Sequence, residues 1–476
     1  MGITLKRIAL FSTLLGFFIC YYSSPYLTSD TLWSAMIGKW IIAHHSVPLV
    51  DYWTWTYYGK PWTAEEWLFD FLLAIVAKGG YQAVVLMMTA VSLTTWLLLA
   101  NTLKFKQVAY PNTWTLLMAA LALSWDQIRA ETFSYLFIAF VFWVIVRDRQ
   151  NPTKWLFCLI PLEIVWVNFH GSFIMGLLFV GWEFVADLFT QRKRIKRLAI
   201  TLIGMFAGTL VNPHGPKMYE FVLWLSLKTN ISKYIAEWQS PTVHENFGLA
   251  IFTVFGLAVI YCFRWAKNGE KVSVKDTVLL ILLLYMFMKA NRFAPYLLLW
   301  LPIWAANKLS FNQPKFVSWF KNEFVKWRPV IYSGLSIGLL GLSIVAVSKI
   351  HGSLEANAAS VLEPKSLAVV EKLHNEHPNW KIWNSYNIGG TLEFSNIPAS
   401  IDGRTDLYLA NGGMQTYTNI INVQPNGVSE FNSYHANIVY IEKDSALAQM
   451  LQIEPQWRMV YTDSYYDVFT RVGVQT

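Results

Sequence analysis

Residues 29–67 read SDTLWSAMIGKWIIAHHSVPLVDYWTWTYYGKPWTAEEW, and this stretch organises the rest of the chain. It follows the first apolar segment and combines the acids Asp30, Asp51, Glu65 and Glu66 with several tryptophans and tyrosines. These two aromatic residues suit a membrane–water boundary, because an apolar ring carries a polar N–H or O–H group. The stretch is therefore predicted to be a long loop at a membrane surface, and its acids are candidates for chemistry.

The overall composition is that of a membrane protein. The 476 residues are 54% hydrophobic and only 14% charged, which is too apolar for a soluble chain of this size. Cys20, Cys158 and Cys262 all lie in apolar runs, so we expect small core residues and neither disulfides nor metal-ligand spacing. Lys6 and Arg7 precede an apolar run without a small-x-small cleavage site, which predicts an uncleaved first span.

Apolar runs of roughly 15–22 residues recur along the chain, near the length that crosses a bilayer core of about 30 Å as a helix. They predict a mainly α, polytopic helical bundle of about eleven spans. The expected spans are 8–24, 81–103, 112–127, 132–147, 155–169, 172–190, 198–211, 248–264, 276–290, 293–309 and 330–348. The apolar run Trp67–Ala77 would cover only about 17 Å as a helix, so we expect it to be interfacial or re-entrant.

The positions of lysine and arginine set the expected orientation. With the N-terminus in the cytoplasm, the inner loops collect about 21 Lys and Arg residues and the outer loops about nine, excluding the C-terminal tail. Treating 67–77 as a span would place the basic run QRKRIKR at 191–197 outside. The charge distribution therefore favours a multi-pass protein with a cytoplasmic N-terminus.

Two domains are expected. Residues 1–348 would form a transmembrane domain with a large first outer loop, 25–80, and another outer loop, 212–247. Residues 349–476 would form a small extracytoplasmic α/β domain, because continuous apolar runs stop there and short alternating segments begin. Strands are expected in WKIWNS (380–385), ANIVYIE (436–442) and YDVFTRV (466–472), helices in 364–375 and 444–452, and turns at NIGG (387–390) and DGRTD (402–406).

A carboxylate just past the outer end of the first span is suited to acid–base chemistry. Asp30 could act as a general base on a hydroxyl group. It could equally help to cap an amphipathic interfacial helix over Thr31–His45. Asp51, Glu65 and Glu66 add acid to the same loop, and together these four are the candidate catalytic residues. No tight Asp-x-Asp pair is present, so we expect no metal, with Mg²⁺ or Mn²⁺ at Asp30 as the alternative.

Two arginines are expected at outer span ends, each flanked by apolar sequence. A charge at the depth of Arg129 or Arg292 is costly unless it is paired, and the planar guanidinium matches a phosphate ester. The alternative is that both side chains reach to the lipid headgroups. Glu131 is a candidate ion-pair partner of Arg129.

Two similar motifs mark other outer span ends, NFHG at 168–171 and NPHG at 212–215. Their amide and imidazole groups could hydrogen-bond sugar hydroxyls or phosphate, and their glycines permit a sharp turn. Capping of the preceding helix is an equally natural role. With the EWQ segment of the outer loop, the candidate substrate-binding residues are Asn168, His170, Asn212, His214 and Glu237.

The order of short motifs along the chain is distinctive. The motifs are D-x-x-W from Asp30, GKPW at 59–62, EWL at 66–68, WVNFHG at 166–171, NPHG at 212–215 and DGRTDLY at 402–408. This order resembles the GT-C superfamily of polytopic membrane glycosyltransferases, near its protein-mannosyltransferase and aminoarabinose-transferase-like members. The tail motif resembles a bacterial branch, which implies a bacterial cell membrane.

The resemblance implies an inverting glycosyltransferase that takes a sugar from a polyprenyl-phosphate-linked donor to an extracytoplasmic glycan, lipid or protein. It implies that Asp30 is the catalytic carboxylate. Family members often carry a second acid directly after it, where this chain has Thr31, and Glu65 or Glu66 is the candidate substitute.

The resemblance also implies a phosphate-binding role for basic residues at outer span ends, which here are Arg129, Arg292 or Lys60. The expected partners are the sugar-carrying lipid, the bilayer and an unknown acceptor, with no nucleic acid. A non-catalytic membrane component, either a lipid-linked glycan transporter or an assembly scaffold with a degenerate GT-C fold, is the alternative. A transporter should carry charges in its span interiors, and Glu163 and Glu183 are the main ones here.

Overall fold

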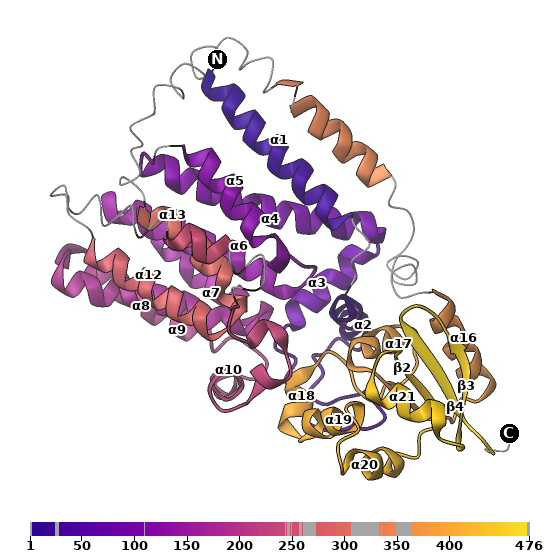
Figure 1. The fold of residues 1–476 in the computed structure, drawn as a ribbon. Helices are drawn as coiled ribbons and strands as arrows, with labels where there is room; N and C mark the ends of the chain where they lie inside the picture. The colour runs from indigo at the N-terminus through magenta and orange to yellow at the C-terminus, as the bar shows by residue number, and fades with distance from the viewer. Residues whose placement is uncertain are drawn as a thin grey trace. The chain divides into compact units, whose positions relative to one another are not determined.

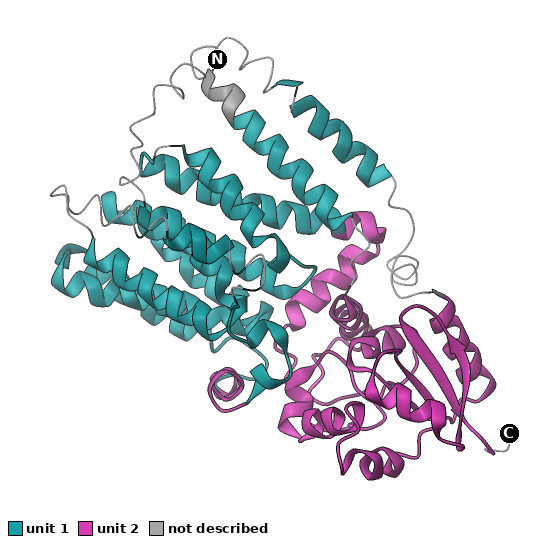
Figure 2. Cartoon of the chain, viewed as in Figure 1, with its two compact units in different colours: residues 1–23, 85–216, 230–350 teal, residues 24–84, 217–229, 351–476 magenta. Residues whose placement is uncertain are grey.

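The computed structural model describes most of the chain, and the account below is confined to that part. The described residues are 2–23, 28–108, 110–242, 244, 248, 250–256, 259, 273–305, 333–334, 336–348 and 364–473. Tertiary contacts divide the chain into two compact units (Figure 2). Unit 1 comprises 1–23, 85–216 and 230–350, and unit 2 comprises 24–84, 217–229 and 351–476.

Among its described residues, the regular secondary structure of unit 1 is entirely helical (Figure 1). Its α-helices are α1 (Gly2–Tyr22), α4 (Gly80–Phe105, whose first turn falls in unit 2), α5 (Pro111–Ala122), α6 (Ala130–Gln150), α7 (Leu159–Phe169), α8 (Ile174–Phe189), α9 (Ile195–Gly208), α12 (Val274–Lys289) and α13 (Ala294–Ala305). Short 3-10 helices flank them at η1 (Leu123–Trp125), η2 (Lys154–Cys158), η3 (Gly171–Phe173), η4 (Arg192–Arg194), η5 (Ile231–Lys233), η6 (Ala236–Trp238) and η7 (Asn291–Phe293).

Three helices of the described chain are long and apolar enough to cross a membrane. They are Gly80–Phe105, Ala130–Gln150 and Gly171–Phe189, and they match the expected spans 81–103, 132–147 and 172–190. The other expected spans that are described fall on shorter apolar helices, such as Arg7–Tyr22 and Ser336–Ser348. About half of the expected span 248–264 lies outside the described residues, so the total of about eleven stays a prediction.

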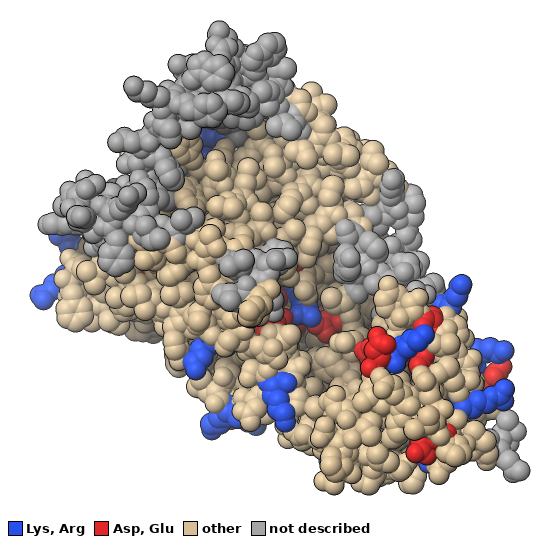
Figure 3. All heavy atoms as spheres, in the orientation of Figure 1, with Lys and Arg blue, Asp and Glu red and all other residues tan. Residues whose placement is uncertain are grey.

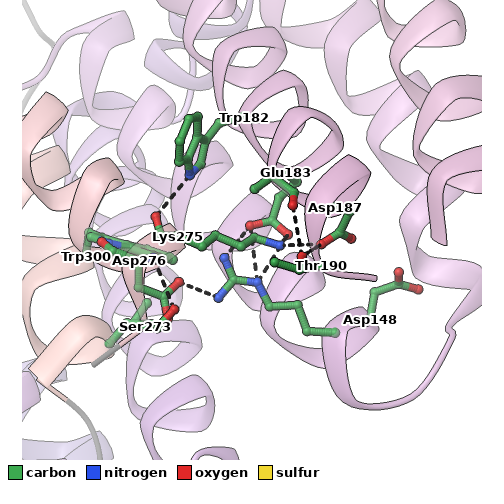
Figure 4. A network of polar contacts seen from close by, with 12 residues as sticks. Asp148, Trp182, Glu183, Asp187, Thr190, Ser273, Lys275, Asp276 and Trp300 are labelled. Carbon is green, nitrogen blue, oxygen red and sulfur yellow. Dashed lines mark hydrogen bonds and ion pairs between the residues drawn. The ribbon is translucent and has the colours of Figure 1, made fainter. Parts of the chain in front are cut away.

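Acids and bases at the ends of four helices of unit 1 form one buried network (Figure 4). Its members are Asp148 and Arg149 of α6, Glu183 and Asp187 of α8, Arg194 of η4, Arg197 of α9, and Lys275 and Asp276 of α12. Lys275 Nζ lies 2.6 Å from Glu183 Oε2 and 2.8 Å from Asp187 Oδ1. The ion pairs of the network join the helices, and its formal charges cancel, so Glu183 is fully paired.

The other acid that we noted inside a span is in a different position. Glu163 of α7 is fully buried, and neither of its carboxylate oxygens has a hydrogen-bond partner among the described residues. A Cβ atom added at Gly176 of α8 would lie 2.5 Å from Glu163 Oε2, so the glycine makes room for this side chain.

Unit 2 combines the first outer loop with the C-terminal residues. Its helices are α2 (Ser29–His44), α3 (Trp67–Ala77), α10 (Lys217–Leu227), α16 (Pro364–Glu376), α17 (Gly389–Phe394), α18 (Thr405–Ala410), α19 (Gly413–Ile421), α20 (Gly427–Ser433), α21 (Ala446–Ile453) and the 3-10 turn η8 (Tyr386–Ile388). Its strands are β1 (Ile382–Asn384), β2 (Ile438–Glu442), β3 (Trp457–Thr462) and β4 (Tyr466–Arg471). The visible charged side chains of Figure 3 gather mainly over this C-terminal part, whereas much of the helical surface is uncharged.

The strands form one four-stranded sheet in the order β1-β2-β4-β3. Strand β1 runs parallel to β2, and the pairs β2–β4 and β3–β4 are antiparallel. Apolar side chains cover both faces. On one face Ile438 and Tyr440 pack with residues of α16 and α17, and on the other Val439 and Ile441 pack with residues of α19, α20 and α21. The tail is therefore a three-layer α/β domain, as expected.

Several details of the tail differ from the sequence-based expectation. The three expected strands are present, but the fourth, β3, and the helices α17–α20 were not expected. NIGG does not form a free turn, because it continues through η8 into the start of α17. DGRTD was expected to form a turn, but only its residues 402–404 lie before helix α18, which begins at Thr405.

The first outer loop packs directly onto the tail. Trp55 donates its backbone N–H to Ala399 O at 3.0 Å and its indole N–H to Ile382 O at 2.9 Å. Thr54 forms an isolated parallel bridge with Ala399. The contacts of this loop group it with residues 351–476.

Helix α2 is more deeply enclosed than an amphipathic interfacial helix. All residues from Thr31 to Gly38 are buried, and the helix packs against α3 and α17. Gly38 allows α3 to come close, because a Cβ atom there would lie 1.9 Å from Asp70 O. Helix α3 has the bounds that the apolar run predicts.

Candidate active site

Asp30 lies in the first turn of α2. Thr28, in an extended conformation with φ −80°, holds the N-cap position without a side-chain capping bond, so Asp30 is not the N-cap residue of α2. A carboxylate in the first turn is stabilised by the positive end of the helix dipole. The Trp33 indole N–H donates to Asp30 Oδ1 at 3.2 Å and so orients the carboxyl group.

Asp51 lies in the loop that follows α2, and it is completely buried. Its Oδ1 atom accepts from the Trp53 backbone N–H at 3.2 Å, and its Oδ2 atom accepts from the Thr54 backbone N–H at 3.2 Å. Arg404 Nη1 lies 2.7 Å from Asp51 Oδ1. These contacts give Asp51 a structural task, since a base must reach its substrate and this carboxylate is enclosed.

Arg404 is the centre of a buried ionic cluster that sequence reasoning missed. Its guanidinium contacts the carboxyl groups of Asp402, Glu393 and Asp51, and all four side chains are inaccessible to solvent. The Trp53 and Trp62 rings each have their centroid 5.0 Å from the guanidinium carbon. Two residues of this cage come from the tail motif DGRTD and three from the first outer loop.

The acids of this cluster carry unequal charge. Burial, together with the neighbouring charge of Asp402, raises the pKa of Glu393 well above its usual range. Burial opposes ionisation of Asp402 as well, but Arg404 outweighs it and lowers the pKa of Asp402. We therefore assign a protonated Glu393 and an ionised Asp402, which leaves Arg404 balanced mainly by Asp402 and Asp51.

The remaining candidates of the first loop lie at its far end. Glu65 and Glu66 are half-buried just before α3, and Glu66 takes the N-cap position of that helix without a side-chain capping bond. Lys60 is exposed at the end of a tight turn in which its backbone N–H donates to Tyr57 O at 2.9 Å.

Arg129 and Arg292 are both in unit 1, and each is paired with a glutamate. Arg129 Nη1 lies 3.1 Å from Glu237 Oε2, and Arg292 Nη2 lies 3.1 Å from Glu131 Oε2. Glu131, which we expected to pair with Arg129, thus forms an ion pair with Arg292. Arg292 is also 3.6 Å from Glu237 Oε1 and stacks over the Trp238 ring at 4.4 Å, so η6 and η7 are held together.

His170 borders this arginine–glutamate group. Its Nε2 atom lies 3.5 Å from Arg292 Nη2, and its Nδ1 atom accepts from the Ser172 backbone N–H at 3.1 Å. Burial, with the positive charges of Arg292 and Arg129, lowers the pKa of His170 to about 3. The imidazole is therefore neutral at physiological pH. Because Nδ1 accepts from Ser172, the ring proton is on Nε2, which only contacts Arg292.

The two asparagines of the repeated motifs act mainly on the backbone. Asn168 donates its side-chain N–H groups to Ile164 O and Val211 O, both at 2.8 Å, which links α7 to the end of α9. Asn212 accepts from the His214 backbone N–H at 2.8 Å and donates to Thr209 O at 2.6 Å. These contacts support the capping alternative for both asparagines. His214 is half-buried in the same turn.

Metal binding gains no support from the arrangement of ligands. Among the described residues, no three His, Cys, Asp or Glu side chains are grouped so as to hold a metal ion. Mg²⁺ or Mn²⁺ at Asp30 remains a prediction from residue type alone.

No protein-family model and no curated protein matches the sequence. Solved structures do match. ArnT from Cupriavidus metallidurans bound to undecaprenyl phosphate has a TM-score of 0.58 at 13% identity, over 99% of this chain and 98% of that one. Its apo state has a TM-score of 0.54 at 13% identity, over 98% of each chain. Both comparisons thus run through the helical part and the tail.

This chain has the GT-C fold. The archaeal oligosaccharyltransferase AglB from Archaeoglobus fulgidus, solved with an inhibitory peptide and a dolichol-phosphate, also matches. Its TM-score is 0.58 at 10% identity, over 91% of this chain and 69% of that one. At these identities the likeness shows the GT-C architecture of a polytopic membrane protein, and it does not show which reaction the site performs.

Proposed function

We propose that this protein is a glycosyltransferase that moves a sugar from a polyprenyl-phosphate donor to an extracytoplasmic acceptor. The observation that carries the proposal is the full-length likeness to ArnT, which was solved with undecaprenyl phosphate, together with the likeness to AglB over 91% of this chain, which was solved with a dolichol-phosphate. A lipid-linked donor also fits a membrane protein, because the polyprenyl chain stays in the bilayer while its sugar phosphate is at the surface.

The proposed reaction is a single displacement. The Asp30 carboxylate takes the proton of an acceptor hydroxyl, whose oxygen bonds to the anomeric carbon. The bond from that carbon to the phosphate oxygen breaks, and the polyprenyl phosphate leaves with the electron pair. Direct attack from the opposite face inverts the anomeric centre. In this scheme Thr31 does not take part in the chemistry, because its side chain is buried in α2.

We propose that the arginine–glutamate group binds the donor phosphate. Arg129 and Arg292 are formally balanced by Glu131 and Glu237, so an incoming phosphate must replace a carboxylate. Glu237 is the one that we expect to yield, because its side chain is 30% exposed and lies on an outer segment, whereas Glu131 is 10% exposed on α6. A phosphate bound there would keep the charge balance and gain the planar fork of Arg292.

The test of the base is the variant Asp30→Asn in full-length protein purified in lipid nanodiscs. Synthetic polyprenyl-phosphate sugars serve as donors, with sugar, lipid and peptide acceptors, and release of polyprenyl phosphate is measured. Loss of a positioned general base is expected to slow transfer by roughly 10²–10⁴-fold while donor binding persists.

The matched control is Asp444→Asn, which removes the same charge from an exposed position of the tail. Its transfer rate should equal that of the wild type. Undiminished transfer by Asp30→Asn would remove Asp30 from the mechanism. Wild-type protein that binds polyprenyl phosphate but turns over no donor would instead favour the non-catalytic alternative.

A further inference from the structure

The tail of unit 2 meets the first turn of α2 at two glycines. A Cβ atom added at Gly403 would lie 2.2 Å from Asp30 Oδ1 and 2.7 Å from the Trp33 indole nitrogen. A Cβ atom added at Gly390 would lie 2.4 Å from Ser29 O. The tail backbone therefore lies in van der Waals contact with the residue that we propose as the base, with Trp33, which orients it, and with Ser29.

A hydrogen bond strengthens this contact. The Gly390 backbone N–H donates to Ser29 Oγ at 3.0 Å, which ties the start of α17 to the start of α2. Gly389 allows the start of α17 to lie close to the segment before Gly403, since a Cβ atom at Gly389 would lie 1.9 Å from Ile401 O. The motifs NIGG and DGRTD thus pack against each other and against the N-terminus of α2.

The loop that carries Gly403 is held from behind. Its neighbours Asp402 and Arg404 are both fully buried, and Arg404 Nε lies 3.0 Å from each carboxylate oxygen of Asp402. Arg404 also binds Asp51 of the first outer loop. Gly403 is therefore fixed between two anchored residues, so it cannot easily move away from Asp30.

We propose that the C-terminal domain positions the base, with Gly403 and Gly390 as positioning residues that set the orientation of the Asp30 carboxylate. This inference rests on the proposed function of Asp30. The tail thereby takes part in the reaction: the backbone at Gly403 packs against the base, and the hydrogen bond from Gly390 to Ser29 holds the helix start that carries it.

The test variant is Gly403→Ala in the full-length protein. The backbone of Gly403 is not in the left-handed region, so alanine is tolerated by the backbone and the added methyl acts through its contacts. A methyl group 2.2 Å from Asp30 Oδ1 must displace the carboxyl group. We expect kcat to fall about 10–100-fold, with the donor KM within about twofold of the wild-type value.

The matched control is Gly427→Ala. A Cβ atom there would lie 2.2 Å from Asn419 O, so the substitution perturbs the packing of α19 and α20 within the tail and touches nothing in α2. A merely structural role of the tail would make both variants lose activity in proportion to their loss of stability. The positioning role predicts that only Gly403→Ala lowers kcat at equal folded fraction.

Two further measurements separate this proposal from the proposed function. In a double-mutant cycle, Gly403→Ala should cost nothing further once Asp30 is Asn, because it acts through that residue. Hydrogen exchange of the peptide 28–36 should quicken in Gly403→Ala without any substrate. Normal kcat and unchanged exchange in a folded Gly403→Ala variant would overturn the positioning role, whereas full transfer by Asp30→Asn would overturn the base itself.

Discussion

Replacing Arg404 by methionine should destabilise unit 2 strongly. Arg404 and its three carboxyl partners are all inaccessible to solvent; Arg404 Nη1 lies 2.7 Å from Asp51 Oδ1, and Asp402 is assigned as ionised. Methionine keeps most of the aliphatic length of the side chain, so the main loss is the charge. Removing one partner of a buried ion pair costs about 3–5 kcal/mol, because the remaining charges stay buried without compensation.

Hydrogen exchange of the β2 and β4 amides in the full-length protein measures this loss. The free energy of opening should fall by about 3–5 kcal/mol in Arg404→Met. Arg458→Met is the control, since Arg458 is exposed on β3 and its removal should change the opening free energy by less than about 0.5 kcal/mol.

The double variant Arg404→Met with Asp51→Asn tests whether the two residues are coupled. Adding Asp51→Asn to Arg404→Met removes one of the stranded anions and should restore part of the lost stability, so the two changes should be non-additive. A loss below about 1 kcal/mol in Arg404→Met, or strict additivity with Asp51→Asn, would refute the assignment of this cluster as a buried ionic hub.

Three other substitutions test separate parts of the structure. Glu393→Gln should match the wild type in stability near pH 4 and become more stable than it as pH rises to 8. The pKa of Glu393 is raised in the folded state, so the wild type loses stability as pH rises above the unfolded-state pKa. A pH series of thermal unfolding checks this, and a stability difference that stays constant with pH would contradict it. Glu237→Gln should tighten polyprenyl phosphate binding about tenfold if the phosphate replaces this carboxylate, whereas weaker binding in nanodisc titrations would show that Glu237 helps to hold the donor. Asn168→Ala should lower the unfolding free energy by about 1–3 kcal/mol through two lost backbone contacts, and unchanged stability with a raised substrate KM would restore its proposed substrate role.

The bundle and the tail could be predicted because their signals are local. Runs of apolar residues determine helices in a membrane protein, and Trp67–Ala77 is a helix with the bounds that its apolar run indicates. The alternating segments of the tail predict β1, β2 and β4 for the same reason. Strand β3 was missed because its sequence WRMVYT has the apolar Val460 on its exposed side, so apolar and polar residues do not alternate strictly along it.

The candidate site was predictable in composition but less so in geometry. Asp30 could be singled out because it begins the motif order that resembles the GT-C superfamily, and Arg292 because an arginine beside apolar sequence needs a partner. Which acid pairs with which base could not be deduced, because ion pairs between distant segments leave no periodic pattern. Arg404 stood in a motif that we noted, and the unexplained acid at Asp51 was the signal that could have led to it.

By itself, the sequence determined that this is a membrane-embedded helical protein with an α/β tail and an acidic, aromatic first loop, because composition and hydrophobic period act over a few residues. Only the tertiary structure decided that Asp51 is enclosed by Arg404, that Glu237 contacts both Arg129 and Arg292, and that Gly403 lies against Asp30. Those roles depend on distances between residues far apart in the chain, and such distances exist only once the chain has folded.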